Sequence, residues 1–510
     1  MKRIFLLIMT GVLIGVSSCD KNFEEINTNP VLPTSLDPVY LFSNAQFGSA
    51  IGTYIYEAQI VQQIVTPFTG VLEGGNHNVV YDPNSSAAFN SLYTGPVKLL
   101  ADVLDKTKDD PARSNLYNMA RIWRAYVFQV LVDTYGDVPY FEAGKAFLEG
   151  TNRPVYDDQK VIYDDILKEY EEATNLLDAA KPIETNDLFY GGNISQWKRL
   201  GNSLLLRAGM RYTKIDPARA EQVVKKAVDP ARGGVMQSIL DNAAVRFNST
   251  NNYNNPAGNN WNGTERANYY LGKPFVDFLK NTNDPRLRFI AVKYEIPANP
   301  LATAGAANTN PADQEGMPFG YNEASISTAP GYPGKTGAAF KYSQINRSTL
   351  GKIDVPEFFV TYAQTQLLLA EAAYRGWITG SAEEYYRTGV MAHMDQLRQY
   401  DASAAIPVAD QMAYLAANPF NPAQALEMIN TQYWVASFLN GSEAWANFRR
   451  SGFPDLDPNP YPGADPVVAG GFVRRLVYPA REISVNAENV SAAIARMGAN
   501  NLATPVFWDK

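Results

Sequence analysis

The sequence predicts a mainly α-helical protein in which tetratricopeptide-like helix pairs form a scaffold that carries a loop-rich, irregular subdomain. Three observations support this fold class. Apolar residues recur with a spacing of three and four along several segments, the links between neighbouring segments are short, and one long central stretch lacks this periodicity. The strict signature of tetratricopeptide repeats is absent, so the sequence alone supports helix pairs and no more.

The first twenty residues have the layout of a secretory signal peptide. A basic start, Lys2 and Arg3, precedes an apolar run over residues 4–16 and two small serines. The apolar run is too short to cross a bilayer as a helix, which takes about 20 apolar residues. We therefore expect residues 1–18 to be removed on export.

Cys19 is the only cysteine of the chain, and it directly follows the predicted signal. The run Val16-Ser17-Ser18-Cys19 resembles the lipobox at which bacterial lipoproteins are diacylated and cleaved, so we expect lipid on Cys19. With no second cysteine, the chain forms neither an intramolecular disulfide nor a cysteine metal cluster. The alternative is an ordinary signal peptide with a chance cysteine near the cut.

The chain is acidic. Loss of Lys2 and Arg3 with the signal moves the formal charge from -8 to -10. Phosphate binding needs clustered Lys and Arg, so this composition argues against nucleic acid as a partner. No other stretch is long and apolar enough to cross a membrane, so we expect attachment to the membrane through the lipid anchor only.

The N-terminal part of the mature chain, residues 19–232, is predicted to be a helical scaffold. Three segments in it carry an apolar stripe, which is a row of apolar residues along one face of a helix. They cover residues 122–131, 162–177 and 197–212. Gly136 and Pro139 end the first stripe, because glycine supplies a left-handed cap and proline stops a helix. Asn193 and Gln196 resemble a capping box ahead of the third.

The central part, residues 233–354, is predicted to be a loop-rich ligand-binding subdomain. This part lacks periodic apolar residues and is rich in Asn, Gly, Pro, Ser and Thr, most clearly in residues 248–270 and 297–311. The stretch keeps many aromatic residues, so we expect it to be ordered. Long ordered loops on a rigid scaffold are where binding residues tend to lie.

The C-terminal part, residues 355–510, is predicted to be a second helical scaffold with a tail. Its stripes cover residues 362–377, 385–397 and 426–436. Within the first, Glu371 lies among small alanines, so we expect it to point into the helix packing and to hydrogen-bond a partner. Trp445, Arg449, Arg474 and neighbouring arginines are interpreted as a network that ties the C-terminal segment to the last helix pair. The alternative is an anion site.

Five strings then appear in a characteristic order. They are DTYGDVPY at 133–140, LLLAEAAYRG at 367–376, NGSEAWANFRRSGFP at 440–454, RRLVYPAREISVN at 474–486 and FWDK at 507–510. Their order and spacing resemble the SusD/RagB family of outer-membrane nutrient-binding lipoproteins, in particular its SusD-like second subgroup. The resemblance runs from the lipobox to the last residues. One departure is Phe507, where the family more often shows a second Trp.

The resemblance implies a fold and a role that composition and spacing do not. It implies helix pairs of tetratricopeptide-like size decorated by a loop-rich subdomain, on a protein that faces outwards from the outer membrane. It also implies capture of a glycan or other oligomeric nutrient and a position as a lid over a SusC-type TonB-dependent transporter. The identity of the nutrient does not follow from the sequence.

Candidate ligand contacts follow from the chemistry of sugars. A pyranose offers an apolar face that suits a flat aromatic ring and a rim of hydroxyls that suits amides and charged donors. Two loop segments combine both kinds of side chain. The predicted ligand-binding residues are Tyr253, Asn260, Trp261, Arg266 and Tyr269 in the first segment, and His77 and Tyr81 in the second. The alternative is that these rings pin long loops to the scaffold while the asparagines serve turns.

No catalytic site is predicted, and we do not expect an enzyme. His77 and His393 are the only histidines, and no Walker loop, HExxH or paired-cysteine zinc motif is present. A glycoside hydrolase needs only two carboxylates, but nothing singles out a pair among the 52 acidic residues. A glycoside hydrolase therefore stays as an alternative, together with a surface adaptor that binds no ligand. No cofactor is predicted, and the sequence leaves open whether calcium or another metal binds.

Overall fold

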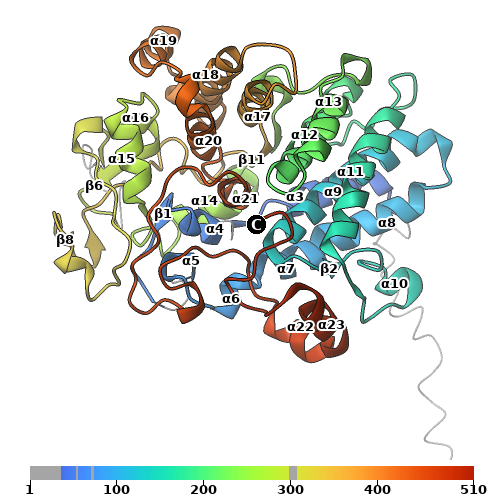
Figure 1. Ribbon diagram of the computed structural model, residues 1–510, viewed down its shortest axis with the longest axis horizontal. Coiled ribbons are helices and arrows are strands. Elements are labelled where there is room, and N and C mark those ends of the chain that lie inside the picture. Colours follow the sequence, from blue (N-terminus) through green and yellow to red (C-terminus); the bar gives the residue numbers. More distant parts are fainter. Residues whose placement is uncertain (1–35, 53–54, 70–73, 298–306) are drawn as a thin grey trace, which may run out of the picture.

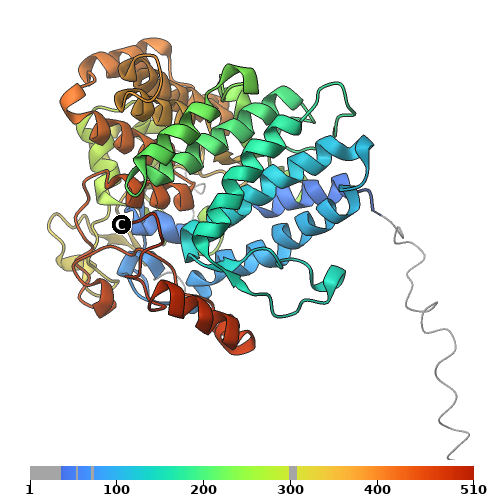
Figure 2. The same cartoon turned by 45° about the vertical axis from the view of Figure 1, so that its right-hand side comes forward.

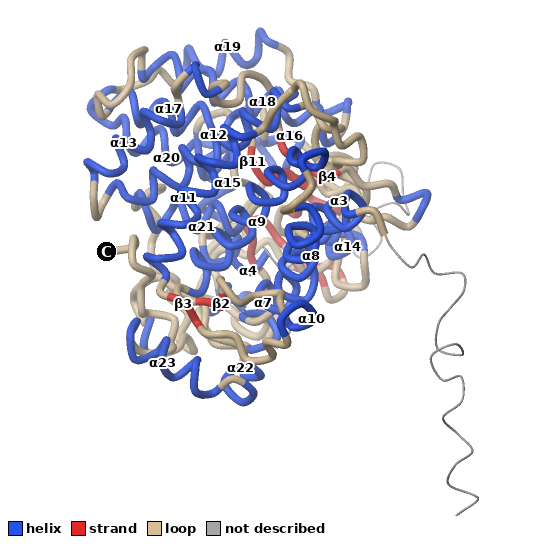
Figure 3. The backbone as a smooth tube through the Cα atoms, turned by 90° about the vertical axis from the view of Figure 1, so that its right-hand side faces the viewer, coloured by secondary structure: helices blue, strands red, loops and turns tan. Residues whose placement is uncertain are grey.

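The computed structural model describes residues 36–52, 55–69, 74–297 and 307–510 (Figure 1). The predicted signal peptide, 1–18, and the predicted lipid site, Cys19, lie outside these residues. Helices make up most of the described chain and the strands are short (Figure 3). None of the helices in the described part combines the length and the apolarity that crossing a membrane requires.

The N-terminal third contains a layer of long helices and several short helices. The helices are α3 (Pro38–Gly48), α4 (Ile55–Ile60), α5 (Gly74–His77), α6 (Asp82–Ser85), α7 (Ala87–Leu92), α8 (Lys98–Thr107), α9 (Ser114–Tyr135), α10 (Ala146–Glu149), α11 (Gln159–Leu176), α12 (Ile194–Met210) and α13 (Pro217–Ala227). From α8 to α13 the long helices pack each against the next and lie side by side (Figure 2). Helices α9, α11 and α12 confirm the three predicted stripes. At the start of α12, the Asn193 side chain accepts from the backbone N–H of Gln196 at 3.2 Å.

The central part contains short helices and small antiparallel strand pairs. The helices are α14 (Pro256–Asn262), α15 (Lys273–Asn281) and α16 (Leu287–Ile290). The strands, including partners from elsewhere in the chain, are β1 (Ile64–Val65), β2 (Val138–Pro139), β3 (Tyr156–Asp157), β4 (Ala243–Val245), β5 (Tyr270–Leu271), β6 (Ala291–Tyr294), β7 (Ala307–Asn308), β8 (Lys335–Thr336), β9 (Ala339–Phe340), β10 (Gln344–Ile345) and β11 (Glu357–Val360). Strand β1 pairs with β5, β2 with β3, β4 with β11 and β8 with β9, while β6 lies between β7 and β10.

The C-terminal third adds a second group of helix pairs. The helices are α17 (Tyr362–Tyr374), α18 (Ala382–Tyr400), α19 (Val408–Ala417), α20 (Ala425–Ala436), α21 (Gly441–Ser451), α22 (Ala480–Val485) and α23 (Ala487–Met497). Helix α17 packs against α18 and α20, and α20 packs against α21. Helices α17, α18 and α20 confirm the three predicted C-terminal stripes. A complete capping box, Thr361 with Gln364, starts α17.

A network of buried charges joins the two helical groups. Arg211 on the N-terminal side donates to Asp133 Oδ2 at 3.2 Å and to Glu443 Oε2 at 2.8 Å. Arg450 and Glu371 form a fully buried pair at 2.7 Å, which confirms that Glu371 points into the helix packing. The predicted tie to the C-terminal segment is also confirmed by contacts such as the one from Arg449 Nη1 to the Arg474 carbonyl, at 2.7 Å.

The apolar side chains form one large core and one small core. The large core runs through both helical groups and reaches from α3 to the residues just before the C-terminus, which lies at one face of the molecule (Figure 3). We call the second cluster the small core. Its members are Val65, Tyr270, Met317, Phe319, Ile326, Ala329, Phe340 and Tyr342. The small core therefore holds loops from the central part together with β1.

Candidate ligand-binding surface

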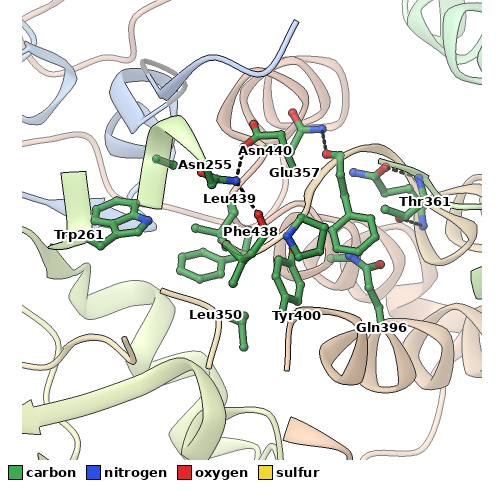
Figure 4. A pocket seen from close by; sticks show the side chains of 16 residues that line it. Asn255, Trp261, Leu350, Glu357, Thr361, Gln396, Tyr400, Phe438, Leu439 and Asn440 are labelled. Carbon is green, nitrogen blue, oxygen red and sulfur yellow. Dashed lines mark hydrogen bonds between the residues drawn. The ribbon is translucent and has the colours of Figure 1, made fainter. Parts of the chain in front are cut away.

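The segment around Trp261 is anchored to the scaffold by its own side chains. Asn255 caps α14, where its Oδ1 accepts from the backbone N–H of Gly258 at 2.9 Å. Trp261 is only 2% exposed and meets Tyr269 edge-to-face, with 5.1 Å between ring centroids. Figure 4 shows Trp261 beside an enclosed pocket that also contains Asn255 and Glu357. In this position the indole contributes to the large core and offers no open ring face.

The other predicted residues of this segment differ in exposure. Asn260 Nδ2 donates to the carbonyl of Gly52 at 3.3 Å, and Arg266 Nη1 donates to the carbonyl of Asn262 at 3.3 Å. Tyr269 is half-buried. Tyr253 is 58% exposed and leans edge-to-face on the ring of Phe47, with 5.9 Å between centroids. Within this segment, Tyr253 is the predicted ring that presents the largest area to solvent.

The pocket in Figure 4 is too small for a sugar. Its free volume is about 10 Å³, which is room for about one water molecule. Asn255 Nδ2 donates to Glu357 Oε2 at 3.2 Å inside it. Burial of Glu357 raises its pKa to about 8, because the hydrogen bond from Asn255 only partly offsets the loss of water around the carboxylate. The pocket is therefore a polar site within the core.

The second predicted pair, His77 and Tyr81, lies near the small core. His77 is buried and its ring stacks on Tyr461, with 4.0 Å between centroids. Its Nε2 lies 3.1 Å from the carbonyl oxygen of Tyr321. Tyr81 is half-buried at the start of α6. These contacts place the segment around Trp261 and the segment around His77 in separate side-chain clusters. They also join His77 to Tyr321 and Tyr461, which were not predicted from the sequence.

Four half-buried rings lie on or next to the small core, and two of them, Tyr321 and Tyr461, belong to residues that contact His77. We call the four the aromatic face: Phe68, Tyr321, Tyr332 and Tyr461. Three of them pack on the small core. Phe68 and Tyr332 both contact the buried ring of Phe340, with centroid distances of 6.0 and 6.3 Å. Because buried rings fix their orientation, these side chains lose little entropy when a ligand stacks on them.

Amide side chains hold the loops of the aromatic face together. In Figure 1 the dark red segment after α21 runs past α5, and Asn459 Nδ2 donates to the carbonyl of Asn76 there. The backbone N–H of Asp465 donates to the Asn78 carbonyl at 3.0 Å. Asn322 lies at the edge of the face, with its Nδ2 3.5 Å from the Tyr461 hydroxyl. Rings with amides at their edge satisfy both requirements of a pyranose.

The aromatic face could not be predicted from the sequence, because its rings are far apart in the chain. Rings and amides that are close together in the sequence indicated two segments, 248–270 and 74–83, whereas the rings of the aromatic face are brought together by the fold. The sequence does contain a weaker indication of these rings. Each of the three tyrosines sits between loop-forming neighbours: Gly320-Tyr321-Asn322, Gly331-Tyr332-Pro333 and Pro460-Tyr461-Pro462. A ring between such residues belongs to neither a helix nor a central strand, so it is available at a surface.

Within residues 36–52, 55–69, 74–297 and 307–510, no group of three or more His, Cys, Asp or Glu side chains is arranged to hold a metal ion.

The chain is similar to several solved structures. A protein described as a chitin-binding protein is 31% identical, with a TM-score of 0.80 over 93% of this chain and 100% of that one. A Bacteroidetes SusD-like protein, AC2a, is 26% identical, with a TM-score of 0.79 over 93% of this chain and 100% of that one. A SusD homologue from Bacteroides uniformis has a TM-score of 0.75 at 21% identity, over 93% of this chain and 98% of that one, and so shows the fold alone.

These similarities confirm the predicted fold class, a mainly helical, tetratricopeptide-like scaffold. No curated protein sequence matches the chain. The family description that matches, over residues 30–479, is SusD-like, "starch-binding associating with outer membrane". Because this match covers most of the chain and the fold agrees over nearly all of it, the protein belongs to the SusD-like family.

Proposed function

We propose that the protein is a lipid-anchored protein of the outer membrane that binds a glycan on the aromatic face and delivers it to a SusC-type TonB-dependent transporter. The observation that carries the binding step is the group of half-buried rings that the small core holds in place. Lipidation at Cys19 is supported by the lipobox-like run Val16-Ser17-Ser18-Cys19, and the outward orientation and the transporter partner are supported by the family resemblance. We propose no catalytic step, so the glycan leaves unchanged.

The geometry suits capture without chemistry. Tyr321 and Tyr332 keep part of each ring at the surface while the rest packs on buried neighbours. When the apolar face of a pyranose lies on such a ring, both surfaces release water, and the apolar area that they bury stabilises the complex. A face with several rings binds an oligomer more tightly than it binds a single sugar. Once one sugar unit is bound, the next units are at a high local concentration near the other rings.

We propose oligomers of N-acetylglucosamine as the first ligands to test. The support is the 31% identical structure described as a chitin-binding protein. The acetamido group of this sugar adds one amide donor and one acceptor to the hydroxyl rim. Asn322 Nδ2, at the edge of the aromatic face, is a donor that suits the acetyl oxygen of such a group, whereas Asn322 Oδ1 already accepts from the backbone N–H groups of Ala324 and Ser325.

The test is calorimetric titration of a soluble form, residues 20–510, with hexamers of N-acetylglucosamine and of glucose. We expect saturable binding of at least one hexamer and a loss of about three- to tenfold in affinity for Tyr332→Ala, which corresponds to one stacking contact. Tyr374→Ala is the matched control, because Tyr374 is 45% exposed at the end of α17, outside the aromatic face.

Two outcomes would contradict the proposal. If neither hexamer binds, the adaptor alternative is favoured, and if new reducing ends appear during incubation, the hydrolase alternative is favoured. The transporter partnership has a separate test, which is gentle solubilisation of the membrane followed by isolation of this chain. Recovery of the chain without a barrel-sized companion would count against delivery while leaving glycan binding intact.

A further inference from the structure

A groove of about 380 Å³ lies next to the aromatic face. Its apolar lining includes Phe319, Pro318 and Pro458. Gly320, with φ +90°, brings the two walls together, since a Cβ at this position would come within 2.6 Å of Pro460. The residues that follow Gly320 and Pro460 are two tyrosines of the aromatic face, so the groove and the face form one continuous surface.

The groove is negatively charged. Lys273 on α15 pairs with Asp277 one turn later, which neutralises that carboxylate. Asp455 and Asp457 also line the groove, and neither pairs with a cation within the part of the chain that the structure describes. Two exposed carboxylates therefore remain beside an apolar floor.

Gln62 supplies a further, independent sign of a ligand site. Its side chain is 4% exposed and lines the groove, where Nε2 donates to the backbone carbonyl of Asp457 at 2.6 Å. Its Oε1 accepts no hydrogen bond from any residue of the described ranges. Gln62 also has φ +59°, a left-handed conformation that is unfavourable for a residue with a side chain. The fold thus leaves Gln62 Oε1 as an acceptor without a partner among the described residues at this groove, on a residue with a strained backbone conformation.

We propose that this groove binds a cationic amino sugar, namely a glucosamine unit of a partly deacetylated N-acetylglucosamine oligomer. This inference rests on the proposed glycan binding and adds a preference for positive charge. The apolar face of the ring would lie on Phe319 and the prolines, and the ammonium group would lie between Asp455 and Asp457, with Gln62 Oε1 as an additional acceptor. A fully acetylated unit has no positive charge to pair with these carboxylates.

The experiment compares hexamers of glucosamine and of N-acetylglucosamine by calorimetry, at a pH of about 5.5 where free amino groups carry protons. For the unmodified protein we expect about fivefold to tenfold tighter binding of the glucosamine hexamer, as two exposed charge pairs would give, and a weaker preference at high salt. The double variant Asp455→Asn/Asp457→Asn should lose this preference and keep its affinity for the acetylated hexamer.

Two controls separate this inference from the proposed function. Glu383→Gln/Glu427→Gln removes the same amount of charge from exposed positions on α18 and α20, and should keep the preference. Tyr332→Ala should weaken binding of both hexamers. Equal affinities of the unmodified protein for the two hexamers, or a preference that survives in the double aspartate variant, would overturn the groove assignment. A normal affinity of Tyr332→Ala would instead contradict the aromatic face.

Discussion

Glu357 shows how one buried side chain can make the stability of this protein depend on pH. Its carboxylate is 6% exposed, and burial raises its pKa from 4.5 to about 8 despite the hydrogen bond from Asn255. Between these two values the unfolded chain loses the proton and the folded protein keeps it. The free energy of unfolding therefore falls as pH rises from about 4.5 to about 8.

We expect Glu357→Gln to remove this pH dependence. Relative to the unmodified protein, the variant should gain stability as pH rises, on the order of a few kcal/mol by about pH 8.5, because one pKa unit corresponds to about 1.4 kcal/mol. Urea unfolding at about pH 5 and pH 8.5 measures the difference. Glu427→Gln, exposed on α20, is the control. The assignment is wrong if the two variants respond to pH in the same way.

At the scale of single residues, the sequence predicted the role of a buried charge more directly than the orientation of aromatic rings. A carboxylate that packs among alanines, as Glu371 does, needs a cationic hydrogen-bond partner, and Arg450 and Arg375 both pair with it. Ring orientation follows no such rule. Trp261 and Tyr253 lie in the same polar segment, yet one is 2% and the other 58% exposed, because the turn of α14 directs the indole towards the scaffold.

The C-terminal tail acts as an element that joins α9 to α21. Trp508 is fully buried, and its Nε1 donates to Asp133 Oδ1 on α9 at 2.9 Å. The guanidinium of Arg449 on α21 lies 4.9 Å from the indole centroid. Next along the chain, Asp509 pairs with Arg474 at 2.6 Å. A single side chain at the end of the chain thus contacts both helical groups.

Trp508→Ala should lower the free energy of unfolding by about 3–5 kcal/mol, because it opens a cavity and leaves Asp133 with one hydrogen bond fewer. Chemical denaturation with far-UV circular dichroism measures the change. Trp377→Ala is the matched control, since Trp377 is half-buried just beyond α17 and its loss should have a smaller effect. Equal destabilisation by the two substitutions would mean that the tail does not join the helical groups.

Long elements were predictable and short ones were not. Helices α9, α11 and α18 repeat their apolar positions over many turns, so a spacing of three and four identifies them without other information. The strand pairs of the central part contain only two to four residues per strand, which is too short for alternation to be recognised. Their partners are also distant in the chain, as Val65 and Tyr270 in β1 and β5 illustrate.

The whole molecule combines a large core that stabilises the scaffold with a small core that orients the aromatic face. Phe340 is central to the second, because it contacts Phe68, Tyr332 and Tyr270, and its backbone N–H donates to the Tyr270 hydroxyl at 2.9 Å. Since the two clusters share no buried apolar member, they can differ in local stability.

Phe340→Ala should therefore loosen the aromatic face while the helical scaffold stays folded. Removing a buried phenyl ring costs about 3–5 kcal/mol, and here the loss falls on the small core. We expect faster amide hydrogen exchange in residues 317–345 with unchanged exchange in α9 and α12, together with weaker glycan binding. Leu205→Ala, in the large core on α12, is the control, because it should speed exchange throughout the scaffold. Faster exchange in α9 of the Phe340 variant would show instead that both cores unfold as one unit, and any loss of binding would then reflect global stability rather than the orientation of the rings.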